Sequence, residues 1–231
     1  MPETLRYSLD GQVATVAMDD GKANALSHEM IEGLLGAIDR AETEASALVL
    51  VGRPERFSAG FDLKIMMSGP EPAKALLRRG SELLMRLYGC KVPLVIACTG
   101  HALAGGALMV LTGDVRIGAD GPFKLGLNEV QIGLPVPVLA MELARDRLLA
   151  SELTRATLLA TIYTPVEAVR AGYLDEVAPV ADVLSKAQAT AQRLAELGRA
   201  PFVATKTRLR QRTIDFINSS LESDMASILP A

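Results

Sequence analysis

Short apolar runs alternate with helical stretches in the first half of the chain, and this alternation constrains the fold most strongly. The apolar runs are residues 48–51 (LVLV) and 94–98 (LVIAC), and residues 114–118 (DVRIG) are expected to form a third short strand. A strand that is apolar at nearly every position is typical of a sheet buried on both faces. Between the first two runs, residues 72–87 carry leucines at helical spacing. The order strand, helix, strand predicts βα units and a mainly parallel sheet.

The two ends of the chain depart from this pattern. An Asp10-Gly11 dipeptide between apolar runs predicts a β-hairpin near the N-terminus. From about residue 137 onward, every segment has helical periodicity, which predicts a helical C-terminal third. We expect residues 1–195 to form the core of the fold and residues 196–231 to form a short C-terminal helical region without a core of its own.

Composition excludes several classes of function. The chain has 231 residues, 49% of them hydrophobic, and a net charge of −3, which excludes a disordered chain. No basic run points to nucleic acid, and two histidines with two cysteines do not suffice for a metal site. No stretch approaches the roughly 20 apolar residues of a membrane span. The N-terminal residues lack the features of a signal peptide, so we expect a cytoplasmic location.

Two glycine-bearing segments follow the first two buried strands. They are residues 57–63 (FSAGFDL) and 100–107 (GHALAGGA), and a helix is expected over residues 102–111. In a parallel sheet both segments lie beyond the carboxyl ends of strands, where ligands bind. Glycine lets backbone N–H groups approach a ligand closely, and two such groups aimed at one point form an oxyanion hole. Taken alone, a Gly-Gly pair after a strand is more often a plain strand–helix turn.

The order of the motifs resembles the enoyl-CoA hydratase/isomerase (crotonase) superfamily. Besides the two glycine segments, the resemblance rests on residues 22–26 (KANAL), 125–134 (LGLNEVQIGL), 164–168 (TPVEA) and 171–177 (AGYLDEV). It extends over about residues 5–210. It implies an α/β crotonase-like spiral of repeated ββα units with a C-terminal helical region. It also implies assembly into a homotrimer or a dimer of trimers.

The resemblance assigns roles to individual residues. The backbone N–H groups of Phe61 and Gly105 are implied to hold the thioester oxygen of an acyl-CoA substrate. Glu129 is implied to be the acid–base residue. No metal or separate cofactor is implied, because CoA arrives as part of the substrate. The implied substrate and CoA contacts are Lys22, Ala23, Ala59, Gly60, Asp62, Leu63 and Leu108, although Asp62 also suits a turn-capping role.

One position separates two reactions within this superfamily. Its hydratases use two glutamates, and the first of them corresponds here to Leu108, which cannot orient water. The second corresponds to Glu129, and one base suffices to move a proton from C2 to C4. The L-N-E-x-Q-x-G context is also similar to the monofunctional Δ3,Δ2-enoyl-CoA isomerases of fatty acid metabolism. The alternatives are hydratase-like or other superfamily chemistry, and a non-catalytic acyl-CoA-binding member.

Three features outside these motifs have simpler interpretations. Asp114 stands at the start of a strand, which favours a structural role over a catalytic one. His101 is more typical of a hydrogen-bonded filler than of a reacting group. The basic stretch 206–212 has two interpretations: a solvated helix face, or a surface that contacts the phosphates of CoA.

Overall fold

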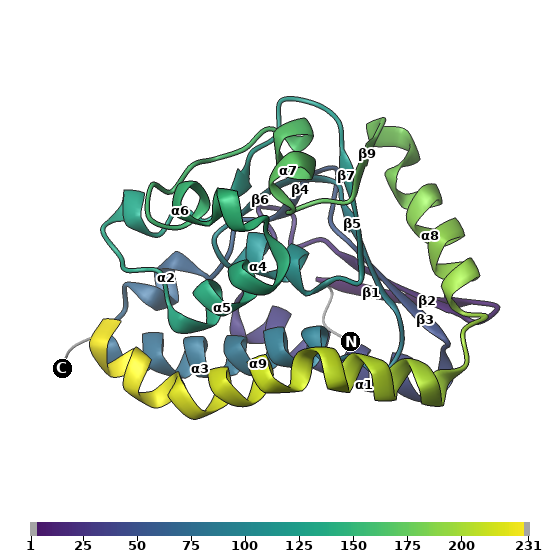
Figure 1. Cartoon of the computed structure of the whole chain (residues 1–231), viewed down its shortest axis with the longest axis horizontal. Coiled ribbons are helices and arrows are strands. Elements are labelled where there is room, and N and C mark those ends of the chain that lie inside the picture. The colour runs from purple at the N-terminus through teal and green to yellow at the C-terminus, as the bar shows by residue number, and fades with distance from the viewer. Residues whose placement is uncertain (1–3, 229–231) are drawn as a thin grey trace.

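Two β-sheets organise this computed structural model, which describes residues 4–228 (Figure 1). The larger sheet has the strand order β1-β2-β3-β5-β7-β9 and the smaller sheet the order β4-β6-β8. The strands are β1 (Leu5–Asp10), β2 (Val13–Met18), β3 (Ala47–Val51), β4 (Glu55–Ser58), β5 (Leu94–Cys98), β6 (Gly100–Leu103), β7 (Val115–Ala119), β8 (Leu125–Gly126) and β9 (Glu176–Ala178).

Helices enclose both sheets. The α-helices are α1 (His28–Glu44), α2 (Leu63–Met66), α3 (Pro70–Tyr88), α4 (Gly105–Thr112), α5 (Val138–Arg147), α6 (Leu153–Ala156), α7 (Pro165–Ala171), α8 (Val183–Leu194) and α9 (Arg199–Ile228). Short 3-10 helices lie at η1 (Val130–Ile132), η2 (Ala150–Glu152) and η3 (Val180–Asp182). None of the helices in this part of the chain is both long enough and apolar enough to cross a membrane.

The larger sheet confirms two predictions, the N-terminal β-hairpin and the mainly parallel pairing of the other strands. Strands β1 and β2 form the antiparallel hairpin predicted at Asp10-Gly11, and the other pairs in this sheet are parallel. The run LVLV is buried on both faces. Leu48 and Leu50 face the main hydrophobic cluster, whereas Val49 and Val51 face a second cluster beneath α8. Both faces are covered, which explains why the run has no polar position.

The smaller sheet corrects one prediction. Residues 100–103 form strand β6 and helix α4 begins only at Gly105, so the helix expected from Ala102 starts three residues too early. Strand β6 lies so close to β4 that a Cβ added at Gly100 would meet the backbone carbonyl carbon of Glu55 at 2.0 Å. The units that begin at β3, β5 and β7 therefore each pass through a strand of the larger sheet, a strand of the smaller sheet and a helical segment, whereas both strands of the first unit, β1 and β2, lie in the larger sheet. This is the ββα repeat that the resemblance implies.

The C-terminal third is mainly helical, as predicted, with one exception. Strand β9 pairs in parallel with β7 and closes one edge of the larger sheet. Three residues with one exposed glutamate carry too little periodicity to distinguish a strand from a loop. Figure 1 shows α8 covering the larger sheet, and α9 running beside α3 and α5. The division of the chain at residue 195 stays a prediction.

A buried ion-pair cluster fixes α9 to the core. The Asp114 carboxylate accepts hydrogen bonds from Lys206 Nζ at 2.7 Å and from the Leu94 backbone N–H at 2.8 Å. Its other oxygen pairs with the Arg210 guanidinium at 2.9 Å. Both cationic side chains are buried, so these two members of the basic stretch serve the fold and do not face solvent. The expected structural role of Asp114 agrees with these contacts.

Candidate active site

Three segments of the chain leave the smaller sheet at the same edge. Strands β4, β6 and β8 are parallel neighbours, so their carboxyl ends lie side by side. The segments that follow them are residues 59–61, 104–106 and 127–129, and each contains a residue implied to act on the substrate. The carboxyl edge of a parallel sheet is where α/β folds bind ligands. The fold thus collects residues that are up to 70 positions apart in the sequence.

The two glycine turns touch each other. Gly60 has a φ of +90°, and a Cβ added there would lie 2.9 Å from the Gly105 backbone nitrogen. A Cβ added at Gly106 would lie 2.1 Å from the Ser58 carbonyl oxygen. Only glycine permits both this conformation and this approach. The contact brings Phe61 and Gly105, the implied oxyanion-hole residues, into one place.

Both implied donors have a free N–H group. The Leu26 N–H donates to the Gly60 carbonyl at 2.8 Å, and the Asp62 N–H donates to the Leu26 carbonyl at 3.2 Å. These bonds flank Phe61, whose own N–H forms no hydrogen bond within residues 4–228. Gly105 opens α4, where the first N–H groups of a helix lack intrahelical partners. Its N–H is likewise unbonded within the described range. Two unbonded N–H groups in adjoining turns are what an oxyanion hole requires, and this role of Phe61 and Gly105 stays a prediction.

A buried asparagine, which the sequence analysis overlooked, holds the first turn in place. The Asn24 side-chain amide donates to the Met18 carbonyl at 3.0 Å and to the Phe57 carbonyl at 3.1 Å. The Ser58 hydroxyl in turn donates to the Asn24 carbonyl at 2.7 Å. Asn24 adopts a φ of 50°, which asparagine tolerates better than most residues. In the sequence, Asn24 stands between two alanines. A polar amide among small apolar residues was the one signal that could have indicated a structural role.

The implied CoA contacts Lys22 and Ala23 lie alongside residues 59–61, the segment that contains the implied donor Phe61. The Ala59 N–H donates to the Ala23 carbonyl at 3.0 Å, so the two chain segments run together here. Lys22 and Ala59 are exposed, whereas Gly60 is buried under the Gly105 turn. A surface with a lysine beside a segment of small residues is chemically suited to an anionic ligand such as CoA. The contacts themselves stay predictions.

The next two implied contacts open helix α2. The Asp62 carboxylate accepts hydrogen bonds from the Lys64 N–H at 2.8 Å and from the Ile65 N–H at 3.4 Å. Asp62 is therefore the N-cap of α2, in line with the turn-capping alternative. Leu63 is 65% exposed beside it. An exposed leucine next to the oxyanion turn is available to an acyl or pantetheine chain, and this role stays a prediction.

Glu129 is the only carboxylate among residues 4–228 that is buried, with 7% of its surface exposed. It follows strand β8 by three residues, and β8 pairs with β6 directly before the Gly105 turn. Its Oε2 atom has no hydrogen-bond partner, and it belongs to no ion pair in the described chain. Burial raises the pKa of Glu129, while its own backbone N–H offsets part of the rise. A carboxyl whose pKa is raised by burial holds a proton more readily, which suits reversible proton transfer.

Leu108 is the residue that the resemblance sets against the first hydratase glutamate, and this correspondence stays a prediction. The residue lies on α4, one turn after the Ala104 carbonyl that accepts its N–H at 3.0 Å. Its side chain is buried in the same hydrophobic cluster as Leu127. Within residues 4–228 no group of three or more His, Cys, Asp or Glu side chains is placed to hold a metal ion.

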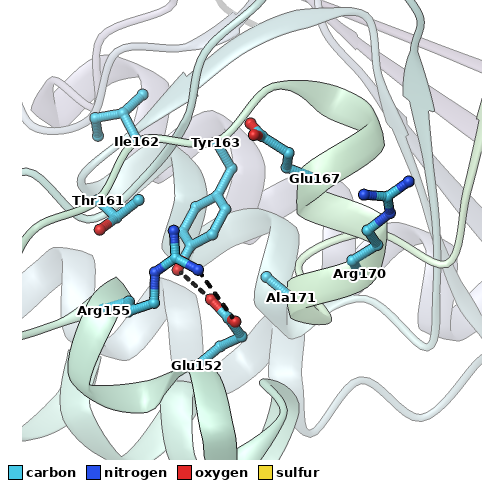
Figure 2. Close-up of a pocket in the computed structure, with 8 residues that line it drawn as sticks. All are labelled: Glu152, Arg155, Thr161, Ile162, Tyr163, Glu167, Arg170 and Ala171. Carbon is cyan, nitrogen blue, oxygen red and sulfur yellow. Dashed lines mark hydrogen bonds and ion pairs between the residues drawn. The ribbon is translucent and has the colours of Figure 1, made fainter.

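A separate pocket lies between α6 and α7. Figure 2 shows its lining, which encloses about 210 Å³ and is rich in charge. Glu152 accepts a hydrogen bond from the Tyr163 hydroxyl at 3.0 Å and pairs with Arg155 at 3.6 Å. None of the implied site residues lines this pocket. Because the pocket contains none of these residues, the sheet edge remains the candidate active site.

His101 has the filler role that the sequence favoured. Its Nδ1 accepts a hydrogen bond from the Lys124 N–H at 3.0 Å, and its ring meets the Phe123 ring edge-on at 5.4 Å. Both contacts tie strand β6 to the loop before β8. Neither involves a residue that is implied to act on the substrate.

Comparison with known proteins agrees with this geometry. Enoyl-CoA delta isomerase 1 of Mus musculus, named as mitochondrial, is 32% identical over 219 residues, which are 92% of this chain and 75% of that protein. A putative enoyl-CoA hydratase of Thermus thermophilus is 34% identical over 214 residues, 86% of this chain and 81% of the other. The crystal structure of an enoyl-CoA hydratase/isomerase family protein from Pseudomonas syringae has a TM-score of 0.95 and 38% identity, with 98% of each chain covered.

A family model described as enoyl-CoA hydratase/isomerase matches residues 9–226, which is nearly the whole chain. The crotonase-like spiral expected from the motifs is thereby confirmed. Relatives named as isomerases and as hydratases match at similar identity, so the names alone do not distinguish the two reactions. The spiral, its sheet-edge site and these matches place the chain in the enoyl-CoA hydratase/isomerase family of acyl-CoA enzymes.

Proposed function

We propose that this enzyme is an enoyl-CoA isomerase, which moves the double bond of a 3-enoyl-CoA to the 2-position. One observation carries the proposal: a single buried and uncompensated carboxylate, Glu129, lies at the sheet edge that bears the two free N–H groups, while leucine occupies position 108. A second carboxylate is needed to activate water, but not to transfer one proton. Fatty acid metabolism is the setting that this substrate class suggests.

The mechanism uses Glu129 as a proton shuttle. The carboxylate removes a proton from C2, and the electrons of that C–H bond form a dienolate conjugated with the thioester. The Phe61 and Gly105 N–H groups donate to the thioester oxygen as negative charge builds up on it. Each such donor is worth about 3–4 kcal/mol in the transition state. Glu129 then returns the same proton to C4, which leaves the double bond between C2 and C3.

The substrate and assembly proposals follow from the same family. Lys22, Ala23, Ala59, Gly60 and their neighbours Asp62, Leu63 and Leu108 are proposed to line the path of CoA and the acyl chain. CoA enters as part of the substrate, and we propose no separate cofactor. A homotrimer or a dimer of trimers and a cytoplasmic location stay predictions, and the mouse relative is named as mitochondrial.

A panel of acyl-CoA thioesters tests the proposal. Purified protein is incubated with 3-enoyl-CoAs of several chain lengths, and the products are identified by chromatography and mass spectrometry. Conversion to 2-enoyl-CoA without a change of mass supports an isomerase. A protein that binds the thioesters and returns all of them unchanged is instead a non-catalytic acyl-CoA-binding member, and the proposal is then wrong.

The oxyanion-hole role of Phe61 belongs to its backbone, so a pair of substitutions tests it. Phe61→Ala keeps the N–H and is expected to retain turnover within about tenfold. Phe61→Pro removes the donor, and turnover is expected to fall by about 100- to 1000-fold. Steady-state kinetics with a 3-enoyl-CoA measures both. Circular dichroism verifies folding, and a well-folded Phe61→Pro variant with wild-type turnover overturns the assignment.

A further inference from the structure

Gly80 lies in the middle of helix α3, and the ring of Phe61 occupies the space where a side chain at this position would stand. Gly80 is buried. A Cβ added there would lie 2.1 Å from Cε1 and 2.6 Å from Cζ of the Phe61 ring. Glycine destabilises the interior of a helix relative to alanine. The space that Gly80 leaves for the ring, which we call the Gly80 socket, gives this glycine a reason.

The other edge of the Phe61 ring faces the second glycine turn. A Cβ added at Gly105 would lie 3.2 Å from Cδ2 of the ring. Gly105 opens α4 and carries the other implied donor. The ring also packs against the main hydrophobic cluster. The side chain of one implied donor residue is therefore confined between helix α3 and the residue that carries the other donor.

Neither the helix nor a simple turn of the ring can make room for a side chain at position 80. Helix α3 is held in the core by Leu76, Leu83 and Leu84, which are all fully buried. Cζ lies on the axis of the χ2 rotation, so turning the ring about χ2 leaves this atom in place. A larger residue at position 80 must therefore change χ1 or the backbone of Phe61, because close-packed interiors transmit such strain.

We propose that Gly80 is a positioning residue, which holds the Phe61 ring in its socket and thereby fixes the direction of the Phe61 N–H. The inference rests on the proposed oxyanion-hole role of that N–H. The peptide group between Gly60 and Phe61 carries the N–H, and its carbonyl accepts a hydrogen bond from the Leu26 N–H at 2.8 Å. The hydrogen bond fixes one end of this peptide, and the confined ring fixes the residue at the other end.

Gly80→Ala tests the inference, with Gly36→Ala as its matched control. Gly80→Ala is expected to lower kcat by about 10- to 100-fold and to leave KM within about threefold, because a misplaced donor weakens binding of the transition state. Gly36 is exposed on helix α1, and a Cβ added there meets nothing within 4 Å. Alanine at position 36 should raise the thermal midpoint and leave kcat unchanged. A folded Gly80→Ala variant with the kcat of wild type, assayed well below its thermal midpoint, overturns the inference.

Phe61→Leu supplies a rescue, because leucine lacks the two ring atoms that the new Cβ would meet. The remaining near atom, Cδ1, would lie 3.4 Å from that Cβ, which is an ordinary contact. If Gly80 acts through the ring, the combined variant is expected to have a kcat within about threefold of that of Phe61→Leu alone. A combined variant as slow as Gly80→Ala shows that position 80 acts by another route, and the inference is then wrong.

Phe61→Leu decides by itself if Gly80→Ala does not fold. An emptied socket holds the N–H less firmly, so kcat is expected to fall by about three- to tenfold with KM unchanged, and an unchanged kcat overturns the inference. Phe61→Pro separates this inference from the proposed function. If a well-folded Phe61→Pro variant retains wild-type turnover, the oxyanion-hole role of the N–H fails. If Phe61→Pro is inactive and a folded Gly80→Ala has the kcat of wild type, only the inference about Gly80 fails.

Discussion

Glu129→Gln is expected to lower isomerase turnover by about two to four orders of magnitude, the usual contribution of a positioned acid–base group. Glutamine keeps the size and shape of the side chain but cannot accept the C2 proton. The two oxyanion donors remain, so binding of acyl-CoA should be nearly unchanged. Stopped-flow or steady-state assays with a 3-enoyl-CoA measure turnover, and calorimetry measures binding. Turnover within tenfold of wild type contradicts the role of Glu129.

The raised pKa of Glu129 provides a control on folding. The folded protein holds the proton of this carboxyl at a pH where the unfolded chain has released it. Stability therefore falls as pH rises from the unfolded pKa through the folded pKa, and the buried charge stays unfavourable above it. Glu129→Gln removes that charge. Its thermal midpoint at pH 8 is expected to equal or exceed that of wild type, so lost activity cannot be assigned to lost folding. A clearly lower midpoint contradicts this account of the carboxyl.

Asp114→Ala is expected to lower the free energy of unfolding by about 3–5 kcal/mol, because it leaves buried cations without their counter-ion. Lys206 and Arg210 are both buried and both contact this carboxylate. Burial lowers the pKa of Lys206, and Asp114 acts against that change. Without Asp114, Lys206 should lose its proton more readily. Urea denaturation followed by circular dichroism measures the change.

Glu176→Ala is the matched control for this effect. Glu176 pairs with Lys186 at 3.4 Å, but both side chains are nearly half exposed. Surface pairs of this kind contribute about 0–1 kcal/mol. The account therefore requires a large difference between the two variants. Equal losses in Asp114→Ala and Glu176→Ala, whether small or large, contradict the proposed anchoring of α9 by a buried cluster.

The parallel core was predictable because its cause is visible in the sequence. Residues 48–51 and 94–98 are apolar at every position, and only a sheet covered on both faces uses such runs. In the structure, the main hydrophobic cluster covers one face of the larger sheet, and the cluster under α8 covers the other. The helical C-terminal third was predictable for the same reason. Periodicity over 10 or more residues is a strong signal.

The smaller sheet was not predictable from the same patterns. Strands β4 and β6 have four residues each and β8 has two, which is too short for periodicity to show. Their polarity is mixed, since ERFS and GHAL hold charged and polar residues among the apolar ones. They are strands because each has a parallel partner beside it. The candidate site lies at the edge of this sheet, so its geometry required the structure.

The residues of the candidate site differ in the same way, because some were predictable from the sequence and others only from the structure. Glu129, Phe61 and Gly105 stood out because ordered motifs resemble those of a known family. Asn24 did not, since its role depends on neighbours distant in the sequence. The Asn24 amide reaches the carbonyl of a residue 33 positions away.

The ratio of isomerisation to hydration tests the central claim most directly. Wild-type protein is given a 3-enoyl-CoA and a 2-enoyl-CoA of equal chain length in separate reactions, and initial rates are followed by mass spectrometry. Hydration adds the mass of one water, whereas isomerisation leaves the mass unchanged. With one carboxylate and Leu108 at the second position, kcat/KM for hydration is predicted to be at least about 100-fold below that for isomerisation. Hydration as fast as isomerisation, or faster, contradicts the isomerase assignment.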